Sequence, residues 1–137
     1  MKKRILIVDN DPASTRMVRL TLEKSDAFQT LELNNPLKAL SVARQFRPDL
    51  MLLDVEMPEM DGGEVARLFR ASPDLHALPI VFMTSLVTDG EVPPGMFADG
   101  SHVLAKPVTM AKLMRCVVEQ LNALCGDKAA PVVPAVR

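Results

Sequence analysis

The sequence has little net charge and no long apolar run, and each shortage excludes a class of protein. Its 16 basic and 17 acidic side chains leave a net charge of −1, so the sequence lacks the excess of positive charge that binds nucleic acid or a membrane surface. No apolar run approaches the roughly 18 residues that a membrane span needs. The run after the basic N-terminus stops at Asp9, which predicts a strand rather than a targeting signal. We therefore expect a cytoplasmic protein that contacts neither nucleic acid nor membrane directly.

Cysteine and histidine are also scarce, and they predict neither a disulfide nor a metal site. Cys116 and Cys125 lie on one predicted helix with a rise of roughly 13 Å between them, which is too far for a disulfide. We expect Cys116 to pack in the core. His76 and His102 lack the spacing of metal ligands and are interpreted as surface or packing residues. With 137 residues, of which 48% are apolar, the chain can form one domain without such cross-links.

What the sequence does contain is an alternation of predicted strands and helices, repeated about five times. The predicted strands are residues 4–9, 28–33, 49–53, 78–84 and 102–107. The predicted helices are residues 12–24, one that opens at Pro36 and reaches Phe46, 62–72, and 110–125, which ends before Gly126. Such an alternation is typical of a parallel sheet with helices on both faces.

Capping residues predict where the helices start, and the spacing of apolar residues predicts which face of each helix is buried. Asp11 before Pro12, and Asn35 before Pro36, are pairs of an N-cap and a first helical residue. Apolar residues at helical spacing predict the core contacts. They are Leu37, Leu40 and Phe46 in the second helix, Val65, Leu68 and Phe69 in the third, and Met110, Leu113, Met114, Val117, Val118, Leu121 and Leu124 in the last.

Two segments break the pattern. Val87 to Ser101 stands where a further helix is due, but it contains Pro93 and Pro94, and a proline inside a helix costs about 3 kcal/mol or more. We predict a short or disrupted helix or a loop there, which responds to changes at the site described next. Residues 126–137 are rich in Ala, Pro and Val, and they predict a tail or linker after a domain of residues 1–125.

The most informative residue is Asp54, which follows the apolar run Leu50 to Leu53 directly. A run of this kind marks a strand covered on both faces, and ligands of open α/β sheets bind beyond the carboxyl ends of such strands. Taken alone, an Asp in this place more often caps a turn. A second predicted strand, however, ends in the acidic cluster Asp9, Asn10 and Asp11, which would lie beside Asp54 if the strands are neighbours.

Two further strands end in matching chemistry. One closes on the hydroxyls of Thr84 and Ser85, and the other closes on Lys106 followed by Pro107. Thr84 alone could be a strand former and Lys106 alone a surface charge. In combination with Asp54 they indicate one shared site, because four strand ends bring carboxylates, a hydroxyl and an ammonium to one edge of the sheet.

This combination resembles the receiver domain of two-component response regulators, and it is similar to the chemotaxis response regulator. The resemblance covers residues 3 to 125, and it is carried by the acidic cluster, the D-x-x-M-P stretch from Asp54 to Pro58, the Thr with a small neighbour, and the K-P pair. It implies a doubly wound five-stranded parallel sheet in the flavodoxin-like order 2-1-3-4-5.

The resemblance also implies that Asp54 is the phospho-acceptor. It assigns Asp9, Asn10, Asp54 and the backbone carbonyl of Glu56 to a Mg²⁺ ion. Asn10 stands where the family has a second Asp, and its amide oxygen can ligate the ion but carries no charge. Metal affinity and phosphorylation are therefore expected to be weaker, unless Asp11 supplies the missing carboxylate.

On the phosphoryl side, the resemblance implies that the Thr84 hydroxyl and the Lys106 ammonium bind the phosphoryl oxygens, with Ser85 leaving room for them. In this family, Pro107 follows a cis peptide bond that aims the Lys inward. Val103 stands where the family often has an aromatic ring that turns inward on phosphorylation. Any signal in this chain is therefore expected to leave by another route.

The implied partners are a sensor histidine kinase or a histidine phosphotransfer protein, and a downstream effector protein or an output domain beyond the tail. A homodimer is compatible with the sequence. One alternative is a degenerate receiver that docks partners without phosphorylation, which Asn10 and the prolines suggest. Another is a haloacid dehalogenase phosphatase, but that family requires an Asp two residues after its nucleophile, where this chain has Glu56.

Overall fold

The computed structural model describes residues 2–84, 102–106 and 108–125, with side chains described up to residue 122. Its elements are β1 (Lys3–Val8), α1 (Pro12–Leu22), β2 (Phe28–Leu33), η1 (Pro36–Lys38), α2 (Ala39–Phe46), β3 (Leu50–Asp54), α3 (Gly62–Ala71), β4 (Ile80–Thr84), β5 (His102–Ala105) and α4 (Met110–Cys125). The predictions for Ser85, for Val87 to Ser101, for the Pro107 peptide bond and for the tail 126–137 lie outside these residues.

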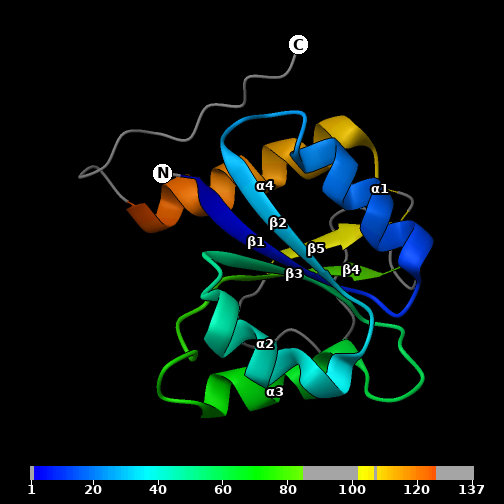
Figure 1. Ribbon diagram of the computed structural model, residues 1–137, viewed down its shortest axis with the longest axis vertical. Helices are drawn as coiled ribbons and strands as arrows, with labels where there is room; N and C mark the ends of the chain where they lie inside the picture. Colours follow the sequence, from blue (N-terminus) through cyan, green and yellow to red (C-terminus); the bar gives the residue numbers. More distant parts are fainter. Residues whose placement is uncertain (1, 85–101, 107, 126–137) are drawn as a thin grey trace.

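The five strands form one sheet in the order β2-β1-β3-β4-β5, and all four pairs of neighbours are parallel (Figure 1). The flavodoxin-like order predicted from the sequence is confirmed. Helices α1 and α4 cover one face of the sheet, and α2 and α3 cover the other.

The central strands are apolar throughout because both faces of the sheet are covered. Alternate strand residues enter two separate cores. Leu6, Met51 and Phe82 pack toward α2 and α3 with Val65 and Phe69. On the opposite face, Ile5, Leu52 and Val81 pack with Leu22 of α1 and with Leu113, Cys116, Val117 and Leu121 of α4.

Short polar signals fix where the helices begin. The Asp11 side chain accepts a hydrogen bond from the backbone N–H of Ala13, and Pro12 is the first residue of α1, as predicted. Asp61 and Glu64 form a reciprocal capping box at the start of α3. Helix α3 thus begins at Gly62, as the sequence predicts.

Several predicted boundaries differ from the structure by one or two residues. Helix α1 ends at Leu22 rather than Lys24, and β4 begins at Ile80 rather than Leu78. The second helix opens with the 3₁₀ turn η1 before α2, because the side chain of Asn35 caps the N–H of Leu37 and the chain closes a tight turn first.

Three residues predicted to lie in the core are exposed instead: Leu37 by 61%, Leu68 by 43% and Met110 by 47%. Leu37 belongs to the 3₁₀ turn and is off the buried stripe of α2. Leu68 lies roughly 100° around α3 from the centre of the stripe made by Val65, Ala66 and Phe69. Met110 is the first residue of α4, about one turn before Leu113, the first buried residue of that helix.

The other helix predictions agree with the structure where it describes them. Leu113, Val117 and Leu121 are buried, and Cys116 is a buried free thiol. Both histidines are exposed. In the parts of the chain that the structure describes, no helix is long and apolar enough to cross a membrane.

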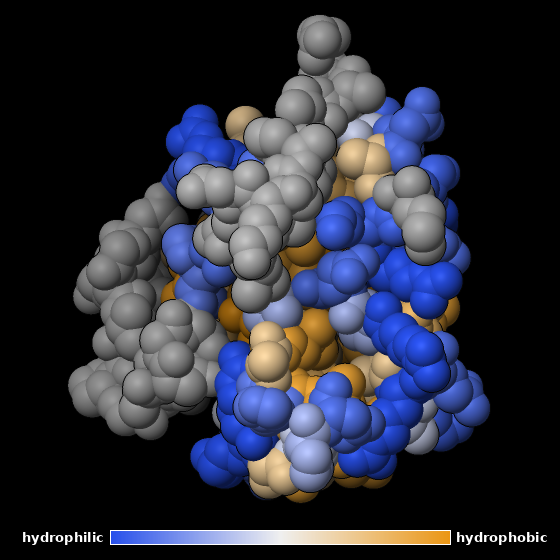
Figure 2. All heavy atoms as spheres, turned by 90° about the vertical axis from the view of Figure 1, so that its left-hand side faces the viewer, coloured by the Kyte–Doolittle hydropathy of each residue, from blue (hydrophilic) through white to orange (hydrophobic). Residues whose placement is uncertain are grey.

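The loops before β3 and β4 lie at the amino-terminal edge of the sheet, away from the carboxyl ends. Figure 2 shows the face at the left of Figure 1, where polar side chains surround a central apolar area. Of the site residues predicted from the sequence, Asp9, Asp54, Thr84 and Lys106 lie at the opposite, carboxyl-terminal edge.

Candidate functional site

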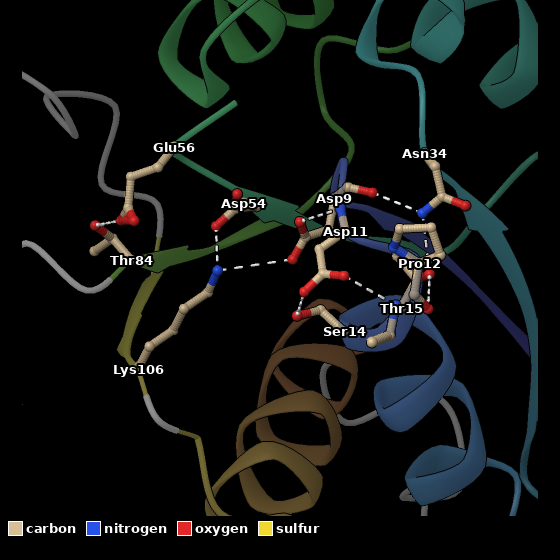
Figure 3. A network of polar contacts seen from close by, with 11 residues as sticks. Asp9, Asp11, Pro12, Ser14, Thr15, Asn34, Asp54, Glu56, Thr84 and Lys106 are labelled. Atoms are coloured by element: carbon tan, nitrogen blue, oxygen red, sulfur yellow. Dashed lines mark hydrogen bonds and ion pairs between the residues drawn. The ribbon is translucent and has the colours of Figure 1, made fainter. Parts of the chain in front are cut away.

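The parallel sheet brings four of the predicted residues together. Asp9 follows β1, Asp54 ends β3, Thr84 ends β4 and Lys106 follows β5, so all four lie at the carboxyl edge of the sheet (Figure 3). The strand order places β3 between β1 and β4, which makes Asp54 the central residue of the group.

The Lys106 ammonium joins the two carboxylates. Its Nζ donates a hydrogen bond of 2.5 Å to Asp54 Oδ1 and lies 3.7 Å from Asp9 Oδ2. The side chain of Asp54 is only 2% exposed and that of Asp9 3%, whereas 29% of the Lys106 side chain reaches solvent. Two nearly buried negative charges therefore share one positive charge.

Burial and charge act against each other here. Burial is the main cause that raises the pKa of Asp54, and the charge of Asp9 adds to it, while the hydrogen bond from Lys106 works in the opposite direction. For Lys106, burial disfavours the ammonium, but the hydrogen bond and the charge of Asp54, together with the charge of Asp9, outweigh it and raise its pKa. Lys106 is thus held as an ammonium beside the Asp54 carboxyl.

Asp9 is fixed in place by the chain around it. Its Oδ1 accepts a hydrogen bond of 3.0 Å from the N–H of Asp11, and its backbone carbonyl accepts one of 2.7 Å from the Asn34 side chain. Its Oδ2 is buried, and it accepts no hydrogen bond within the described part of the chain. Lys106 pairs with this oxygen as an ion at 3.7 Å, which is too far for a hydrogen bond, so the buried oxygen still lacks a donor or a closer cation.

The two residues after Asp9, Asn10 and Asp11, do not offer a free carboxylate to a metal ion. Both oxygens of Asp11 serve α1: Oδ1 accepts from the N–H of Ala13 and Oδ2 from the Ser14 hydroxyl. Asn10 is exposed. The carboxylate that could replace a missing charge is therefore occupied as a helix cap.

The residues present fit a hard divalent cation such as Mg²⁺. In the described ranges no three His, Cys, Asp or Glu side chains gather as a complete metal cage. Two carboxylates are nevertheless enough for Mg²⁺, which usually keeps several waters and takes one or two protein carboxylates. The orphaned Oδ2 of Asp9, next to Asp54, is the observation that favours such an ion.

A contact that the sequence did not predict ties the loop after β3 to β4. The Thr84 hydroxyl donates a hydrogen bond of 2.6 Å to Glu56 Oε1, on the side of Asp54 away from Asp9 (Figure 3). The sequence pointed only to the backbone carbonyl of Glu56. Nothing in the sequence shows the side-chain contact, because the two residues are 28 positions apart.

Gly62 is a second residue that sequence reasoning missed as part of the site. A Cβ atom at this position would lie 2.6 Å from the carbonyl oxygen of Asp54 and 2.9 Å from Cα of Val55. Glycine is therefore required for α3 to approach the end of β3 at Asp54 and Val55. The pair Gly62 and Gly63 directly after Asp61 is the signal that could have indicated it.

A groove of about 400 Å³ opens beside the acidic residues. It runs along α1 and is mostly apolar. Its described lining consists of Asp9, Ser14, Met17, Val18, Met83, Lys106 and Val108.

The sheet order, together with two buried Asp residues and a Lys at its carboxyl edge, defines the class of flavodoxin-like receiver domains. The family model of the response regulator receiver domain matches residues 5–118 of this chain. The chain therefore belongs to the receiver domains of two-component response regulators, and the phosphatase interpretation is set aside.

Curated relatives are response regulators. The chain is 33% identical over 122 residues to the DNA-binding response regulator MtrA of Mycolicibacterium smegmatis, which covers 89% of this chain and 52% of that protein. It is 27% identical over 127 residues to the polar-differentiation response regulator DivK of Brucella anthropi, covering 93% and 99%. The chain thus spans about half the length of MtrA but nearly all of DivK.

Solved structures show the same fold. A signal receiver domain of a signal transduction histidine kinase from Syntrophus aciditrophicus is similar with a TM-score of 0.74 and 27% identity, covering 97% of this chain and 98% of the other. The chemotaxis protein CheY4 of Vibrio cholerae gives a TM-score of 0.76, covering 89% and 100%; at 24% identity this likeness concerns the fold alone.

Proposed function

We propose that this receiver domain accepts a phosphoryl group on Asp54 from a phosphohistidine of a sensor histidine kinase or a histidine phosphotransfer protein. The observation that carries the proposal is the nearly buried Asp54 carboxylate, held 2.5 Å from the Lys106 ammonium. An ammonium in this position orients the carboxylate and supplies positive charge for the incoming group.

The transfer is a displacement at phosphorus. A carboxylate oxygen of Asp54 forms a bond to phosphorus as the P–N bond of the phosphohistidine breaks, and the electron pair of that bond leaves on the imidazole nitrogen. The product is an acyl phosphate. Lys106 and Thr84 donate hydrogen bonds to phosphoryl oxygens, and Ser85 is assigned to the same pocket.

Asp9, Asp54 and the backbone carbonyl of Glu56 are the proposed Mg²⁺ ligands, with the Asn10 amide at the position of a further one. Bound there, the ion would neutralise charge on the phosphoryl oxygens. The protein's own residues do the remaining work: they hold the acceptor, donate hydrogen bonds and keep most water away from Asp54.

The signal is then received by a downstream effector protein, or by an output domain joined after residues 126–137. The groove beside Asp9 and Lys106 gives the donor protein an apolar surface next to the acceptor. A homodimer is compatible with this arrangement. The domain catalyses at most its own phosphorylation and dephosphorylation.

Intact-mass measurement with acetyl phosphate tests the proposal. We expect one phosphoryl group per chain in the presence of Mg²⁺, strongly reduced labelling with a chelator, and none in Asp54→Asn. Asp26→Asn, which removes an exposed carboxylate from the turn before β2, is the matched control and should label like the parent. Labelling of Asp54→Asn to the parent's level would contradict the assignment.

A further inference from the structure

We propose that the side chain of Glu56 restrains the Thr84 hydroxyl in the resting protein and competes with the phosphoryl group for its proton. Glu56 would then be a positioning residue that sets how readily Asp54 is phosphorylated. This inference rests on the proposed function, since it concerns the same acceptor.

The contact has the form of a charge-assisted hydrogen bond. Thr84 is fully buried, Glu56 is exposed, and the hydroxyl donates to Glu56 Oε1 at 2.6 Å. A threonine hydroxyl carries one proton and can donate only one strong hydrogen bond at a time. A bond to a carboxylate is roughly twice as strong as one between neutral groups, so the proton is held firmly.

An arriving phosphoryl group needs that same proton. It brings about −1.5 to −2 charges and three acceptor oxygens, beside the carboxylates of Asp9 and Asp54. Among the described side chains, the Lys106 ammonium is the positive group that contacts the acceptor. Every further donor therefore matters, and Thr84 can turn toward the phosphoryl oxygens only by leaving Glu56.

The charge of Glu56 also reaches the acceptor. Burial is the largest cause of the raised pKa of Asp54, and the charges of Asp9 and Glu56 act in the same direction. Glu56 thus opposes phosphorylation in two ways, through the proton that it holds and through its negative charge. The two contributions predict different behaviour in variants that separate them.

The contact itself is tested in the resting protein, without any phosphodonor. We would measure urea unfolding of Glu56→Ala, Thr84→Val and the double variant, because Val keeps the shape of Thr and lacks the hydroxyl. Non-additive effects of the two changes are expected. Additive effects would show that the hydroxyl and the carboxylate do not interact, and the inference would be overturned.

Competition is tested by the rate of labelling with acetyl phosphate. Glu56→Ala should raise the rate by roughly tenfold in the Thr84 background, as expected for release from one charged hydrogen bond. In the Thr84→Val background the same change should alter the rate by less than about twofold. Glu56→Gln, which keeps an acceptor oxygen without the charge, should give a rate between that of the parent and that of Glu56→Ala.

Glu59→Ala is the matched control, because Glu59 is another exposed carboxylate of the same loop. Its removal should change the rate by less than about twofold. A gain equal to that of Glu56→Ala, or an undiminished gain in the Thr84→Val background, would mean that charge alone acts and would overturn the inference. A result in which neither the parent nor any variant is phosphorylated, although the unfolding data show coupling, would contradict the proposed function. It would also contradict the proposed competition for the Thr84 proton. The hydrogen bond between Glu56 and Thr84 would still be supported.

Discussion

Asn10 is the residue at which this chain departs most clearly from an all-carboxylate metal site. It is exposed, and its neighbour Asp11 is occupied as the N-cap of α1 through both carboxylate oxygens. Neither residue therefore adds a free negative charge to Asp9 and Asp54. A divalent ion would enter a site with less charge than two adjacent Asp residues would give.

We predict that Asn10→Asp tightens Mg²⁺ binding by roughly tenfold, because the charge of the ligands tunes the affinity of such sites. Calorimetric titration is the suitable measurement, since the chain has no Trp or Tyr to report on the ion. Gln45→Glu makes the same change of charge on α2 and should leave the affinity unaltered. Equal affinity before and after Asn10→Asp would show that Asp11 leaves its cap and already supplies the charge.

Cys116 gives a second prediction at this scale. Burial against the sheet raises its pKa to about 12, so almost no thiolate exists at neutral pH. In a Cys125→Ser variant, where it is the sole thiol, we expect labelling by a disulfide reagent only as fast as the protein unfolds. Labelling in native buffer at the rate of a free cysteine would contradict the burial of this side chain.

At the scale of elements, the strands and their ends were predictable from the sequence. Runs such as Leu50 to Leu53 are apolar at every position because both sheet faces are covered, and a polar residue after each run marks the carboxyl edge. Leu37 and Leu68 were assigned to the core wrongly, because spacing along the chain does not show which side of a helix the sheet lies on. The contact of Glu56 with Thr84 depends on the path of a loop, which no local pattern specifies.

The junction of α3 with the end of β3 at Asp54 predicts a difference between two adjacent glycines. Gly62→Ala should lower the free energy of unfolding by about 1–3 kcal/mol, because its Cβ would meet backbone atoms at 2.6 and 2.9 Å. At Gly63 the nearest atom, 3.2 Å away, belongs to the Asp61 side chain, and Ala favours the helix. Gly63→Ala should therefore stay within about 1 kcal/mol of the parent. Equal losses in urea unfolding would contradict this account of the junction.

The tie between α1 and β2 predicts how stability depends on pH. Glu32 accepts hydrogen bonds from the Thr15 hydroxyl, at 2.7 Å, and from Arg19. The bond from Thr15 is the main cause that lowers the pKa of Glu32 below its ordinary value of 4.5, and Arg19 adds to it. A lowered pKa means that the carboxylate stabilises the fold above that value, and that the gain is lost as the pH falls through the folded-state pKa.

Urea unfolding at pH values from about 7 to about 3, a range that spans the titration of a carboxylate, checks this expectation. Glu32→Gln should be less stable than the parent at neutral pH, and the difference should shrink in acid. Glu59→Gln, an exposed carboxylate of the loop before α3, should follow the parent. A constant difference across the range would show that the pairing of Glu32 does not contribute.

At the scale of the whole molecule, the sheet separates two apolar cores and leaves one edge for chemistry. Helices α1 and α4 pack on one face and α2 and α3 on the other, so the strands cannot shift without disturbing both cores. Asp9, Asp54, Thr84 and Lys106 all belong to the carboxyl edge of this frame. The receiver fold could be inferred from the sequence because the strand ends and the acidic cluster are sequential patterns, whereas the arrangement around Asp9 Oδ2 needed the structure.

The most direct test of the account is to locate the phosphoryl group after reaction with acetyl phosphate and Mg²⁺. Borohydride converts an aspartyl phosphate to homoserine, and peptide mass mapping then identifies the residue. We predict conversion at Asp54 alone, and strongly reduced conversion without Mg²⁺. Conversion at Asp9 or Asp11, or none at all under conditions in which the protein is folded, would contradict the claim that Asp54 is the acceptor.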